Sequence, residues 1–446
     1  MRTTTLTIAG LLGLALLAPT TNATAAGETC RGEAATIVGT GQLVVGTEGR
    51  DVIVTGSSTV VSALGGDDLI CVSEPVSAAH LLEVLAGEGN DFVDASSLTS
   101  GYSGRVELGA GADTFAGGGA ADFVSAGYFP DPRDYNAQPG SDVDTDRVET
   151  GTGDDTVFSG SSGTANHDVV DVGAGDDRFY LGTSAAGGDA VLTGGDGDDP
   201  LSLPIGDSDV TLDQALGTLT SAQGTARVVG FEAVTVDAGS GKLTYRGTRG
   251  DDSLTVRSDG APTVDIATDR GQDLLVIEPA SVAEGSRIDL GRGVDRVVAA
   301  TSAGSLELNL GFYQRLAIGG AKVASVSGIE DALLVAPEVT LVGSNADNDL
   351  SFAGCEGTLR GGHGRDTLRN VAQRFFASTS YSFDCTTRTT MDGGPDRDRL
   401  RGGQGPDRLR GQGGNDRLEG RGGRDKADGG QGLDRCTAEV ERRCER

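Results

Sequence analysis

The sequence has little of what a large globular core is usually built from. Among its 446 residues there is no tryptophan, and aromatic side chains make up only 4%. Aromatic residues dominate the energetics of most cores, so their scarcity favours a narrow core filled by valine, leucine and isoleucine. Only three histidines occur, scattered at His80, His167 and His363, and no two cysteines have C-x-x-C spacing. These absences weigh against a zinc site.

Catalytic motifs are missing as well. The chain has no H-E-x-x-H segment and no G-x-S-x-G segment, which argues against a zinc protease and an α/β-hydrolase. No separate catalytic domain can be recognised, so we expect no catalytic residues and no enzyme activity. A calcium-dependent polysaccharide lyase or hydrolase on a β-helix is the alternative, because such enzymes can act with clustered aspartates and arginines, and this chain carries both throughout.

Positive charge is also scarce. Acidic residues outnumber basic ones by 66 to 36, which gives a net charge of −30. Self-repulsion of this size destabilises a compact state unless cations bind, and the acidity argues against nucleic acid as a partner. Lysine occurs only at Lys242, Lys322 and Lys426, and this preference for arginine suggests a GC-rich bacterial genome.

One stretch of the chain is long and apolar. Residues 1–26 contain Arg2, an apolar run from Leu6 to Ala18, and small residues at 23–25, which together are typical of a secretory signal peptide. The run is too short to span a bilayer. Because no second apolar stretch follows, we expect a soluble protein that is secreted to the extracellular space and has no membrane span.

Glycine is abundant, with 72 residues, and near the C-terminus the glycines repeat in strict register. Five nonapeptides run end to end from Gly393: GGPDRDRLR, GGQGPDRLR, GQGGNDRLE, GRGGRDKAD and GGQGLDRCT. A further copy, GGHGRDTLR, begins at Gly361. The sixth position of every copy is an aspartate: Asp366, Asp398, Asp407, Asp416, Asp425 and Asp434.

This pattern resembles the G-G-x-G-x-D-x-U-x nonapeptide of the RTX, or hemolysin-type, calcium-binding repeat family. The resemblance implies a secreted bacterial protein whose repeats hold calcium ions with the aspartates and the backbone of the glycine turns. The implied metal-binding positions are therefore these six aspartates together with glycines one and four of the middle copies. Those glycines are Gly402, Gly405, Gly411, Gly414, Gly420 and Gly423.

The spacing itself predicts where the carboxylates lie. Glycine permits a tight turn, and the residues after the aspartate form a short strand whose middle side chain points inward. Two nonads make one coil, so equivalent turns recur every eighteen residues. We therefore expect Asp398, Asp416 and Asp434 to stack on one side, with Asp407 and Asp425 stacked on the other. Stacked carboxylates repel by roughly 1 to 4 kcal/mol per pair, which a divalent cation would offset.

Eroded copies of the pattern continue through the rest of the chain. They include GTEGRDVIV from Gly46, AGEGNDFVD from Ala86, TGTGDDTVF from Thr150 and LGRGVDRVV from Leu290. Strand-forming runs bounded by glycine and aspartate indicate an all-β chain, and a regular repeat makes it a solenoid. Where glycines are lost, we expect the aspartates to be turn residues rather than ligands. Examples are Asp68, Asp91, Asp155, Asp177 and Asp252.

We predict an all-β fold, a right-handed parallel β-helix or β-roll solenoid. The signal peptide over 1–26 precedes degenerate coils over 27–345, and a regular calcium-binding β-roll follows over 346–446. A second echo supports internal repetition, because VVGFEAVTV from Val228 resembles SVSGIEDALLV from Ser325.

Six cysteines in an exported protein point to three disulfides, and six cysteines allow fifteen pairings. We expect neighbours along the chain to pair, with the last pair closing the C-terminal coil. The expected pairs are Cys30 with Cys71, Cys355 with Cys385, and Cys436 with Cys444.

Two further features bear on partners. A basic residue follows the aspartate in each of the five adjoining copies. This basic ladder either balances nearby acids, which we favour, or binds an anionic polymer. It consists of Arg399, Arg408, Arg417, Lys426 and Arg435. The aromatic stretch from Arg374 to Phe383 either forms a binding knob or packs onto the rod, which we favour.

The sequence as a whole leads to a functional expectation. We predict a secreted protein that folds when calcium binds and has a structural or adhesive role, with a cell-surface glycan or protein as its partner.

Overall fold

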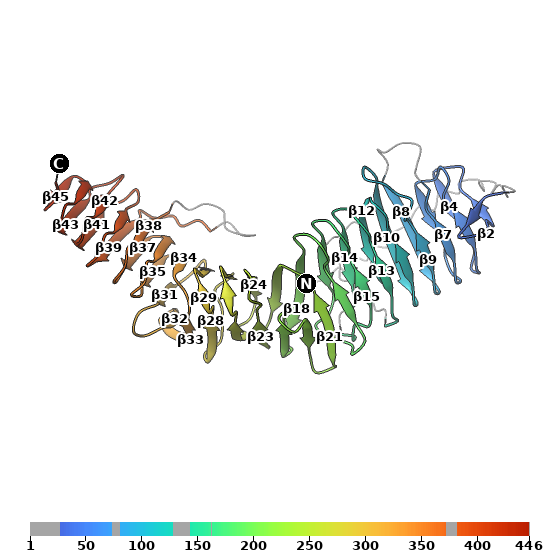
Figure 1. Ribbon diagram of the computed structural model, residues 1–446, viewed down its shortest axis with the longest axis horizontal. Coiled ribbons are helices and arrows are strands. Elements are labelled where there is room, and N and C mark those ends of the chain that lie inside the picture. Colours follow the sequence, from blue (N-terminus) through green and yellow to red (C-terminus); the bar gives the residue numbers. More distant parts are fainter. Residues whose placement is uncertain (1–26, 74–80, 128–142, 162, 372–380, 446) are drawn as a thin grey trace, which may run out of the picture.

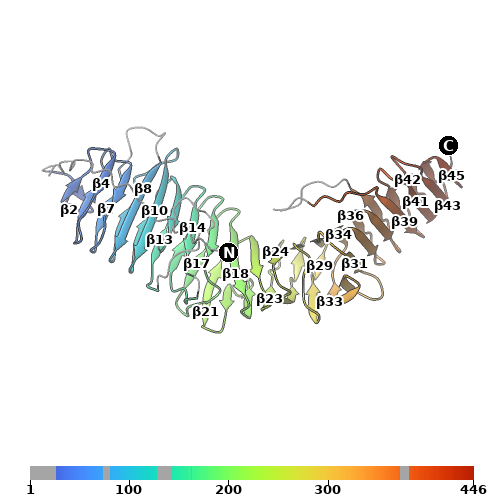
Figure 2. The same cartoon turned by 180° about the vertical axis from the view of Figure 1, so that it is seen from behind.

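The protein is an elongated stack of β-coils (Figures 1 and 2). The structure is a computed structural model that describes residues 27–73, 81–127, 143–161, 163–371 and 381–445. Within these residues every regular element is a strand, and nearly all strands pair in parallel. The all-β parallel solenoid expected from the repeats is therefore confirmed. The expected leader over 1–26 lies outside the described residues.

Two long sheets run along the rod, and the chain alternates between them. Sheet I contains, in spatial order, β3 (Ile37–Val38), β5 (Val52–Val54), β7 (Leu69–Cys71), β9 (Phe92–Asp94), β11 (Thr114–Ala116), β13 (Arg147–Glu149), β15 (Val169–Asp171), β17 (Val191–Thr193), β21 (Thr225–Val229), β20 (Thr218–Thr220), β19 (Val210–Asp213), β23 (Lys242–Arg246), β25 (Thr263–Ala267), β28 (Ser286–Asp289), β33 (Ala321–Ser327), β32 (Arg315–Ile318), β31 (Ser305–Asn309), β35 (Glu338–Val342), β37 (Glu356–Arg360), β39 (Arg388–Gly394), β41 (Asp407–Gly413), β43 (Lys426–Gln431) and β45 (Val440–Arg442).

Sheet II faces sheet I across the core. It contains β4 (Leu43–Val45), β6 (Val60–Ser62), β8 (Leu82–Glu88), β10 (Ser103–Ala110), β12 (Ala121–Ser125), β14 (Thr156–Ser159), β16 (Arg178–Leu181), β18 (Pro200–Gly206), β22 (Ala233–Ala238), β24 (Ser253–Ser258), β27 (Leu274–Ile277), β30 (Arg296–Ala300), β34 (Asp331–Val335), β36 (Asp349–Ala353), β38 (Thr367–Asn370), β40 (Arg399–Arg401), β42 (Arg417–Glu419) and β44 (Arg435–Thr437). Two short pairs flank the long sheets: β1 (Thr29–Cys30) with β2 (Glu33–Ala34), and β26 (Arg270–Gly271) with β29 (Arg292–Gly293).

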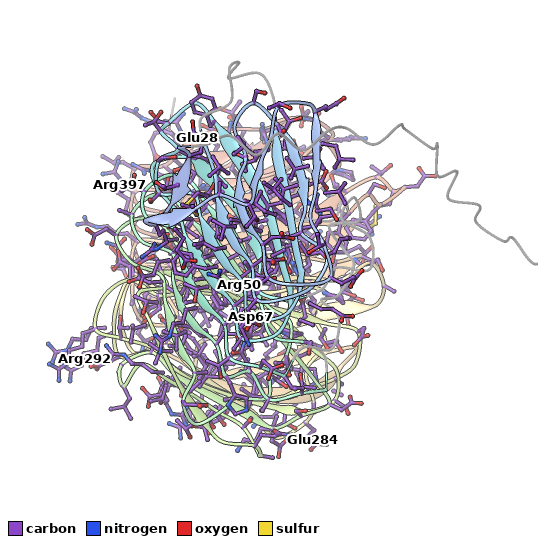
Figure 3. All side chains as sticks on the ribbon, turned by 90° about the vertical axis from the view of Figure 1, so that its right-hand side faces the viewer. Glu28, Arg50, Asp67, Glu284, Arg292 and Arg397 are labelled. Atoms are coloured by element: carbon purple, nitrogen blue, oxygen red, sulfur yellow. A yellow bond between two sulfur atoms is a disulfide. The ribbon has the colours of Figure 1, made fainter. Side chains whose placement is uncertain are left out.

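The core is a thin column between the two sheets. Side chains alternate inward and outward along each strand, as in β41, where Leu409 is fully buried between exposed neighbours. In the regular repeats, Leu400 pairs in register with Leu368 on one side and Leu418 on the other. One contiguous apolar cluster extends from Ile37 to Ala427. In the end-on view, charged side chains such as Arg292 project away from the rod (Figure 3).

Two three-stranded insertions bend the rod. In each, sheet I takes in an antiparallel meander, β19–β20–β21 or β31–β32–β33, where an ordinary coil adds one strand. Sheet I thus gains two strands over sheet II at each place, or about 10 Å of extra length. Figure 1 shows β21, β23 and β33 along the outer side of the curve. The two echoes begin in the last strand of each meander and continue into β22 and β34.

Three disulfides fasten the stack, and they join the pairs expected from the sequence: Cys30–Cys71, Cys355–Cys385 and Cys436–Cys444. Near the second bridge, Tyr381 and Phe383 pack on a buried apolar patch of the outer face of sheet II. This part of the aromatic stretch therefore packs onto the rod, whereas residues 372–380 lie outside the described residues. The described residues contain no helix long and apolar enough to cross a membrane.

Candidate metal-binding turns

The aspartates of the regular repeats form two hydrogen-bonded columns along the corners of the coil. The backbone N–H of Asp398 donates to Oδ1 of Asp416, and that of Asp416 donates to Oδ1 of Asp434, both at 2.9 Å. On the opposite corner, the N–H of Asp407 donates to Oδ1 of Asp425 at 2.9 Å. The stacking expected from the eighteen-residue spacing is confirmed in both columns. Asp416, Asp434 and Asp425 thus each receive one hydrogen bond from the preceding coil.

Asp366 belongs to the same column, although a longer connection separates it from the adjoining repeats. Its N–H donates to Oδ1 of Asp398 at 2.9 Å, across 32 residues of sequence. At the C-terminal end, glutamates take the place of aspartate. The N–H of Asp425 donates to Oε2 of Glu439 at 2.7 Å, and the N–H of Asp434 donates to Oε2 of Glu445. The segment after the last repeat therefore completes both columns.

The second oxygen of these carboxylates has no hydrogen-bond partner. Asp398, Asp425 and Asp434 are fully buried, and Asp366 and Asp416 are 1% and 2% exposed. In all five, Oδ2 is buried without a donor among the described residues. A buried, unpaired carboxylate oxygen is costly, so it calls for a proton or a cation beside it. Asp407 differs, because its Oδ2 accepts the Gly403 N–H at 2.6 Å.

Glycine at turn position one creates the space beside this oxygen. A Cβ on Gly411 would lie 2.1 Å from Oδ2 of Asp416 and 2.4 Å from the carbonyl oxygen of Gly429 in the next coil. A carboxylate oxygen and a backbone carbonyl oxygen therefore meet where a side chain would otherwise stand. Gly402 has the same environment, with Oδ2 of Asp407 2.3 Å and the carbonyl oxygen of Gly420 2.6 Å from its Cβ position. At Gly420, Oδ2 of Asp425 lies 2.3 Å from the Cβ position.

Glycine at turn position four lets successive turns stack closely. Gly414 has a φ of +110°, and a Cβ there would lie 2.3 Å from the carbonyl oxygen of Asp396 in the coil before. Gly423 and Gly405 likewise face carbonyl oxygens, of Gly405 and Thr387 respectively. Backbone carbonyls thus crowd the interface between turns, and only a residue without Cβ fits.

The donor set is suited to a hard cation. Among the described residues, no three His, Cys, Asp or Glu side chains converge on a common point. A metal at these turns would therefore have to combine aspartate oxygens with the carbonyl oxygens of the glycine turns. Calcium accepts six to eight oxygens of both kinds in flexible geometry, whereas zinc prefers nitrogen and sulfur in a tetrahedron. The residues present fit calcium.

Two copies lack glycine at position two, yet their turns keep the glycine conformation. Gln412 and Arg421 have φ angles of 77° and 78°. A residue with a side chain adopts this left-handed region at a cost of roughly 1 to 2 kcal/mol. The turn geometry is therefore imposed by the stack and not by the local sequence alone.

Burial strongly perturbs the carboxylates of the columns. It raises the pKa of Asp398 to about 8, and the neighbouring Asp366 and Asp416 carboxylates add to the effect. Burial also raises the pKa of Asp366 and of Asp416 to about 6. The pKa values of Asp407 and Asp425 are raised for the same reason. Near neutral pH, Asp398 therefore holds a proton unless a cation replaces it.

The columns extend far beyond the regular repeats. In the N-terminal part, the N–H of Asp68 donates to Oδ1 of Asp91 at 2.8 Å, and that of Asp155 donates to Oδ1 of Asp177 at 2.7 Å. Further on, Asp252 donates in the same way to Asp273 at 2.9 Å. These aspartates are buried like those of the regular copies. Hydrogen bonding therefore does not separate the eroded turns from the regular ones.

Sequence reasoning missed several members of these columns. Asp199, which accepts the N–H of Asp177 at 2.9 Å, and Asp273, whose N–H donates to Oδ1 of Asp295 at 2.9 Å, lie in none of the copies identified in the sequence. Asp295 itself is the sixth residue of the eroded copy from Leu290. In Asp199 and in Asp273, a glycine precedes the aspartate by two residues and an apolar residue follows it by two. That shorter pattern would have found them. Burial raises the pKa of Asp122 to about 8, of Asp68 and Asp177 to about 7, and of Asp91 and Asp295 to about 6.

Where a meander interrupts the coils, glutamate replaces aspartate. Oε2 of Glu232 accepts the Asp199 N–H at 2.9 Å, and Oε2 of Glu330 accepts the Asp295 N–H at 3.1 Å. The next member of the column after Glu330 is the neutral Asn348. Its N–H donates to Oδ1 of Asp366 at 2.9 Å, and its own Oδ1 accepts the Ser344 N–H. From this point the column repeats every 18 residues, apart from the longer connection before Asp398.

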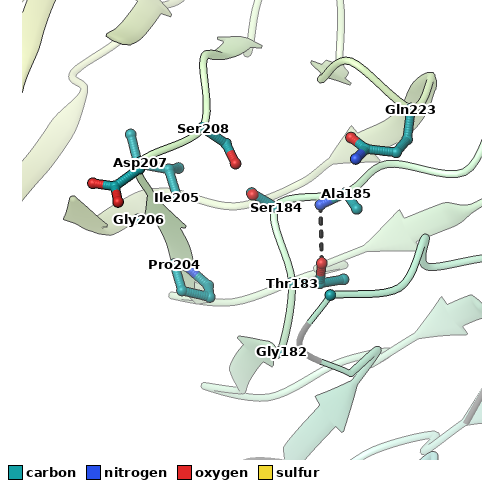
Figure 4. Close-up of a pocket in the computed structure, with 11 residues that line it drawn as sticks. Gly182, Thr183, Ser184, Ala185, Pro204, Ile205, Gly206, Asp207, Ser208 and Gln223 are labelled. Atoms are coloured by element: carbon teal, nitrogen blue, oxygen red, sulfur yellow. Dashed lines mark hydrogen bonds between the residues drawn. The ribbon is translucent and has the colours of Figure 1, made fainter. Parts of the chain in front are cut away.

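A groove on the side of the rod offers little chemistry. Figure 4 shows it between the segments 182–185 and 204–208, with Gln223 at its edge. Thr183 Oγ1 accepts the Ala185 N–H at 3.0 Å, which fixes the loop. Among the described residues that line it, the one acid is Asp207, which accepts hydrogen bonds from Ser240. The groove therefore does not favour the lyase or hydrolase alternative, which needs several clustered ionisable groups.

Comparison with known families agrees with this geometry. The family model of the RTX calcium-binding nonapeptide repeat matches four times, over residues 100–127, 142–162, 161–185 and 392–427. Three of these matches lie in the eroded part, which supports its kinship with the regular copies. No curated protein matches the chain. Aspartate columns, glycine turns and these four matches together mean that the chain carries RTX calcium-binding nonapeptide repeats, folded as a β-roll solenoid.

Proposed function

We propose that this chain is a secreted calcium-binding β-roll that folds fully when calcium neutralises its stacked aspartates. The observation that carries the proposal is the buried carboxylate oxygen without a donor, such as Oδ2 of Asp416, next to a carbonyl of the following coil. Calcium bound there would supply the positive charge that a proton otherwise supplies. The oxygen ligands would come from the chain's own carboxylates and backbone carbonyls.

The proposed ligands are the aspartates and the turn carbonyls of the regular copies. The aspartates supply carboxylate oxygen, and the glycines at positions one and four let carbonyl oxygens of successive turns approach it. The proposed set is Asp366, Asp398, Asp407, Asp416, Asp425 and Asp434, with Gly402, Gly405, Gly411, Gly414, Gly420 and Gly423.

Secretion would expose these turns to the calcium outside the cell. With residues 1–26 as a signal peptide, the chain would leave a cell interior poor in calcium and meet millimolar calcium outside. A ligand at 100 times its Kd that binds only the folded state stabilises that state by about 2.7 kcal/mol per site. The degenerate coils over 27–345 and the regular coils over 346–446 would then form one stiff rod, suited to a structural or adhesive role at the cell surface.

The test is a calcium titration of the mature chain with its disulfides intact. We expect calcium to raise the β signal in circular dichroism and the melting temperature, and calorimetry to detect binding. Asp416→Asn should weaken binding because it removes the charged oxygen. The matched control is Asp428→Asn, since Asp428 faces outward and pairs with Arg443. Identical spectra and melting curves in EDTA and in millimolar calcium would refute the proposal.

A further inference from the structure

The outer face of sheet II is basic at its C-terminal end. We define the arginine face as Arg399 and Arg401 on β40, Arg417 on β42 and Arg435 on β44, all exposed. Arg399, Arg417 and Arg435 stand directly beside one another, because the strands pair in parallel register. Adjacent strands lie about 4.8 Å apart, so three guanidinium-bearing side chains start at that interval along the rod.

Such a row of like charges is unfavourable by itself. Like charges in directly paired positions of a sheet destabilise the pairing. Within the described residues, Arg399 and Arg435 form no ion pair, whereas Arg417 pairs with Glu419 at 2.5 Å. Glu419 also lies 3.7 Å from Arg401, so one acid serves two arginines. The row therefore keeps uncompensated positive charge.

The opposite face arranges its charges differently. On sheet I, Arg410, Asp428 and Arg442 pair in register, so opposite charges alternate across the strands. Asp428 is also held by Arg443 at 2.6 Å, and the pKa of its carboxyl is lowered by that guanidinium. Sheet I also has a like-charged pair, Arg408 beside Lys426, but Val440 follows it, whereas the row on sheet II continues through three arginines.

The basic character of this face depends on where the acids point. The regular repeats contain nearly as many acidic as basic residues, but the five repeat aspartates are buried in the turns. The inference rests on the proposed function in this respect, because calcium on those aspartates removes their negative charge and leaves the outer face positive. The full sequence has a net charge of −30, so this end is a basic tip on an acidic molecule.

We propose that the arginine face binds a linear anionic polysaccharide that lies along the rod. Thr367, Arg369, Arg399, Arg401, Arg417 and Glu419 line a groove over these strands. Arginine binds carboxylate and sulfate groups through paired N–H donors, and the strand spacing is comparable to the rise of one sugar in an extended chain.

The neighbouring side chains favour this partner over other polyanions. The outward positions of β40, β42 and β44 hold arginine, glutamate and threonine, with no aromatic ring to stack on a base and no apolar side chain to enter a membrane. The strong negative charge of the rest of the rod would also repel the dense charge of duplex DNA.

The test uses the full mature chain in calcium and a short oligogalacturonate as the probe, with a neutral galactan of similar length as control. Titration calorimetry should detect binding of the acidic oligomer that weakens as salt rises. The triple variant Arg399→Gln, Arg417→Gln, Arg435→Gln should bind about tenfold or more weakly, since each exposed arginine makes a modest contribution and three are removed.

The control variant removes the same charge from the other face. Arg408→Gln, Lys426→Gln, Arg442→Gln should bind nearly as well as the unaltered chain. No binding of the acidic oligomer, or equal losses in both variants, would overturn the proposal. Equal and equally arginine-dependent binding of duplex DNA or anionic vesicles would also overturn it. Circular dichroism in calcium and in EDTA is read in parallel, so loss of calcium-dependent folding is distinguished from loss of the polysaccharide site.

Discussion

Calcium binding to the stacked aspartates should release protons, and fewer should be released as the pH rises. Burial raises the pKa of Asp398 to about 8 and that of its neighbour Asp416 to about 6. At pH 7 the pair then carries about one proton, almost all of it on Asp398. At pH 5 it carries about 1.9 protons, and at pH 8.5 about 0.2. If calcium binding requires both carboxylates to be charged, it should release these numbers of protons at each pH.

The same shifts fix the sign of the pH dependence without calcium. The folded-state pKa values lie above the ordinary aspartate value of 3.8, so the folded state binds more protons than the unfolded state. Their contribution to stability is fully present below about pH 4 and is lost as the pH rises through 6 to 8. In EDTA the melting temperature should therefore fall between pH 5 and 8 by this contribution. In saturating calcium the fall should be absent, because calcium binds more tightly once the carboxylates are charged.

The measurement is calorimetry at fixed pH in two buffers of different ionisation enthalpy, whose difference in heat gives the protons released. Asp398→Asn should remove most of the proton release at pH 7 for this pair, because Asp398 carries the more strongly raised pKa. The control Asp428→Asn should leave it unchanged, since Asp428 lies on the outer face. Equal proton release at pH 5 and 8.5, or a melting temperature in EDTA that rises with pH, would refute the reasoning.

Two further predictions concern the turns. Gly411→Ala should weaken calcium binding and cost roughly 1–3 kcal/mol in urea unfolding, because its Cβ would lie 2.1 Å from Oδ2 of Asp416; Gly188→Ala, where a Cβ meets nothing within 4 Å, should cost little, and equal losses would contradict the packing argument. Arg421→Gly should raise stability in calcium by about 0.5–1 kcal/mol by relieving its left-handed backbone; Arg424→Gly in the same turn should not, and a gain in both would point to the charge instead.

Much of the fold could be predicted because its rules are local. Glycine before aspartate specifies a turn, and alternation after it specifies a strand with one inward side chain, as at Leu409 and Leu418. Since the period is constant in the last repeats, the stacking of Asp398, Asp416 and Asp434 follows from counting. The disulfides follow for a related reason, because neighbouring cysteines lie on adjacent coils or at one end.

The candidate site could be predicted less completely, because hydrogen bonding between coils does not depend on a perfect motif. Asp199 and Asp273 occupy the same columns although their turns keep only part of the glycine pattern. Glu439 and Glu445 complete the columns from a segment without repeats. A carboxylate belongs to a column because of its position in the stack of coils, and the neighbouring coil determines that position.

The sequence by itself determined the repeating unit: a turn that needs glycine, an aspartate at the corner, and a short strand with an apolar centre. Tertiary structure alone decided which coils meet. The meanders β19–β21 and β31–β33 lengthen one sheet and bend the rod, and the parallel register aligns Arg399, Arg417 and Arg435. The physical reason is that turn and strand geometry arise within a few residues, whereas pairing across insertions depends on which free strand edge the returning chain finds.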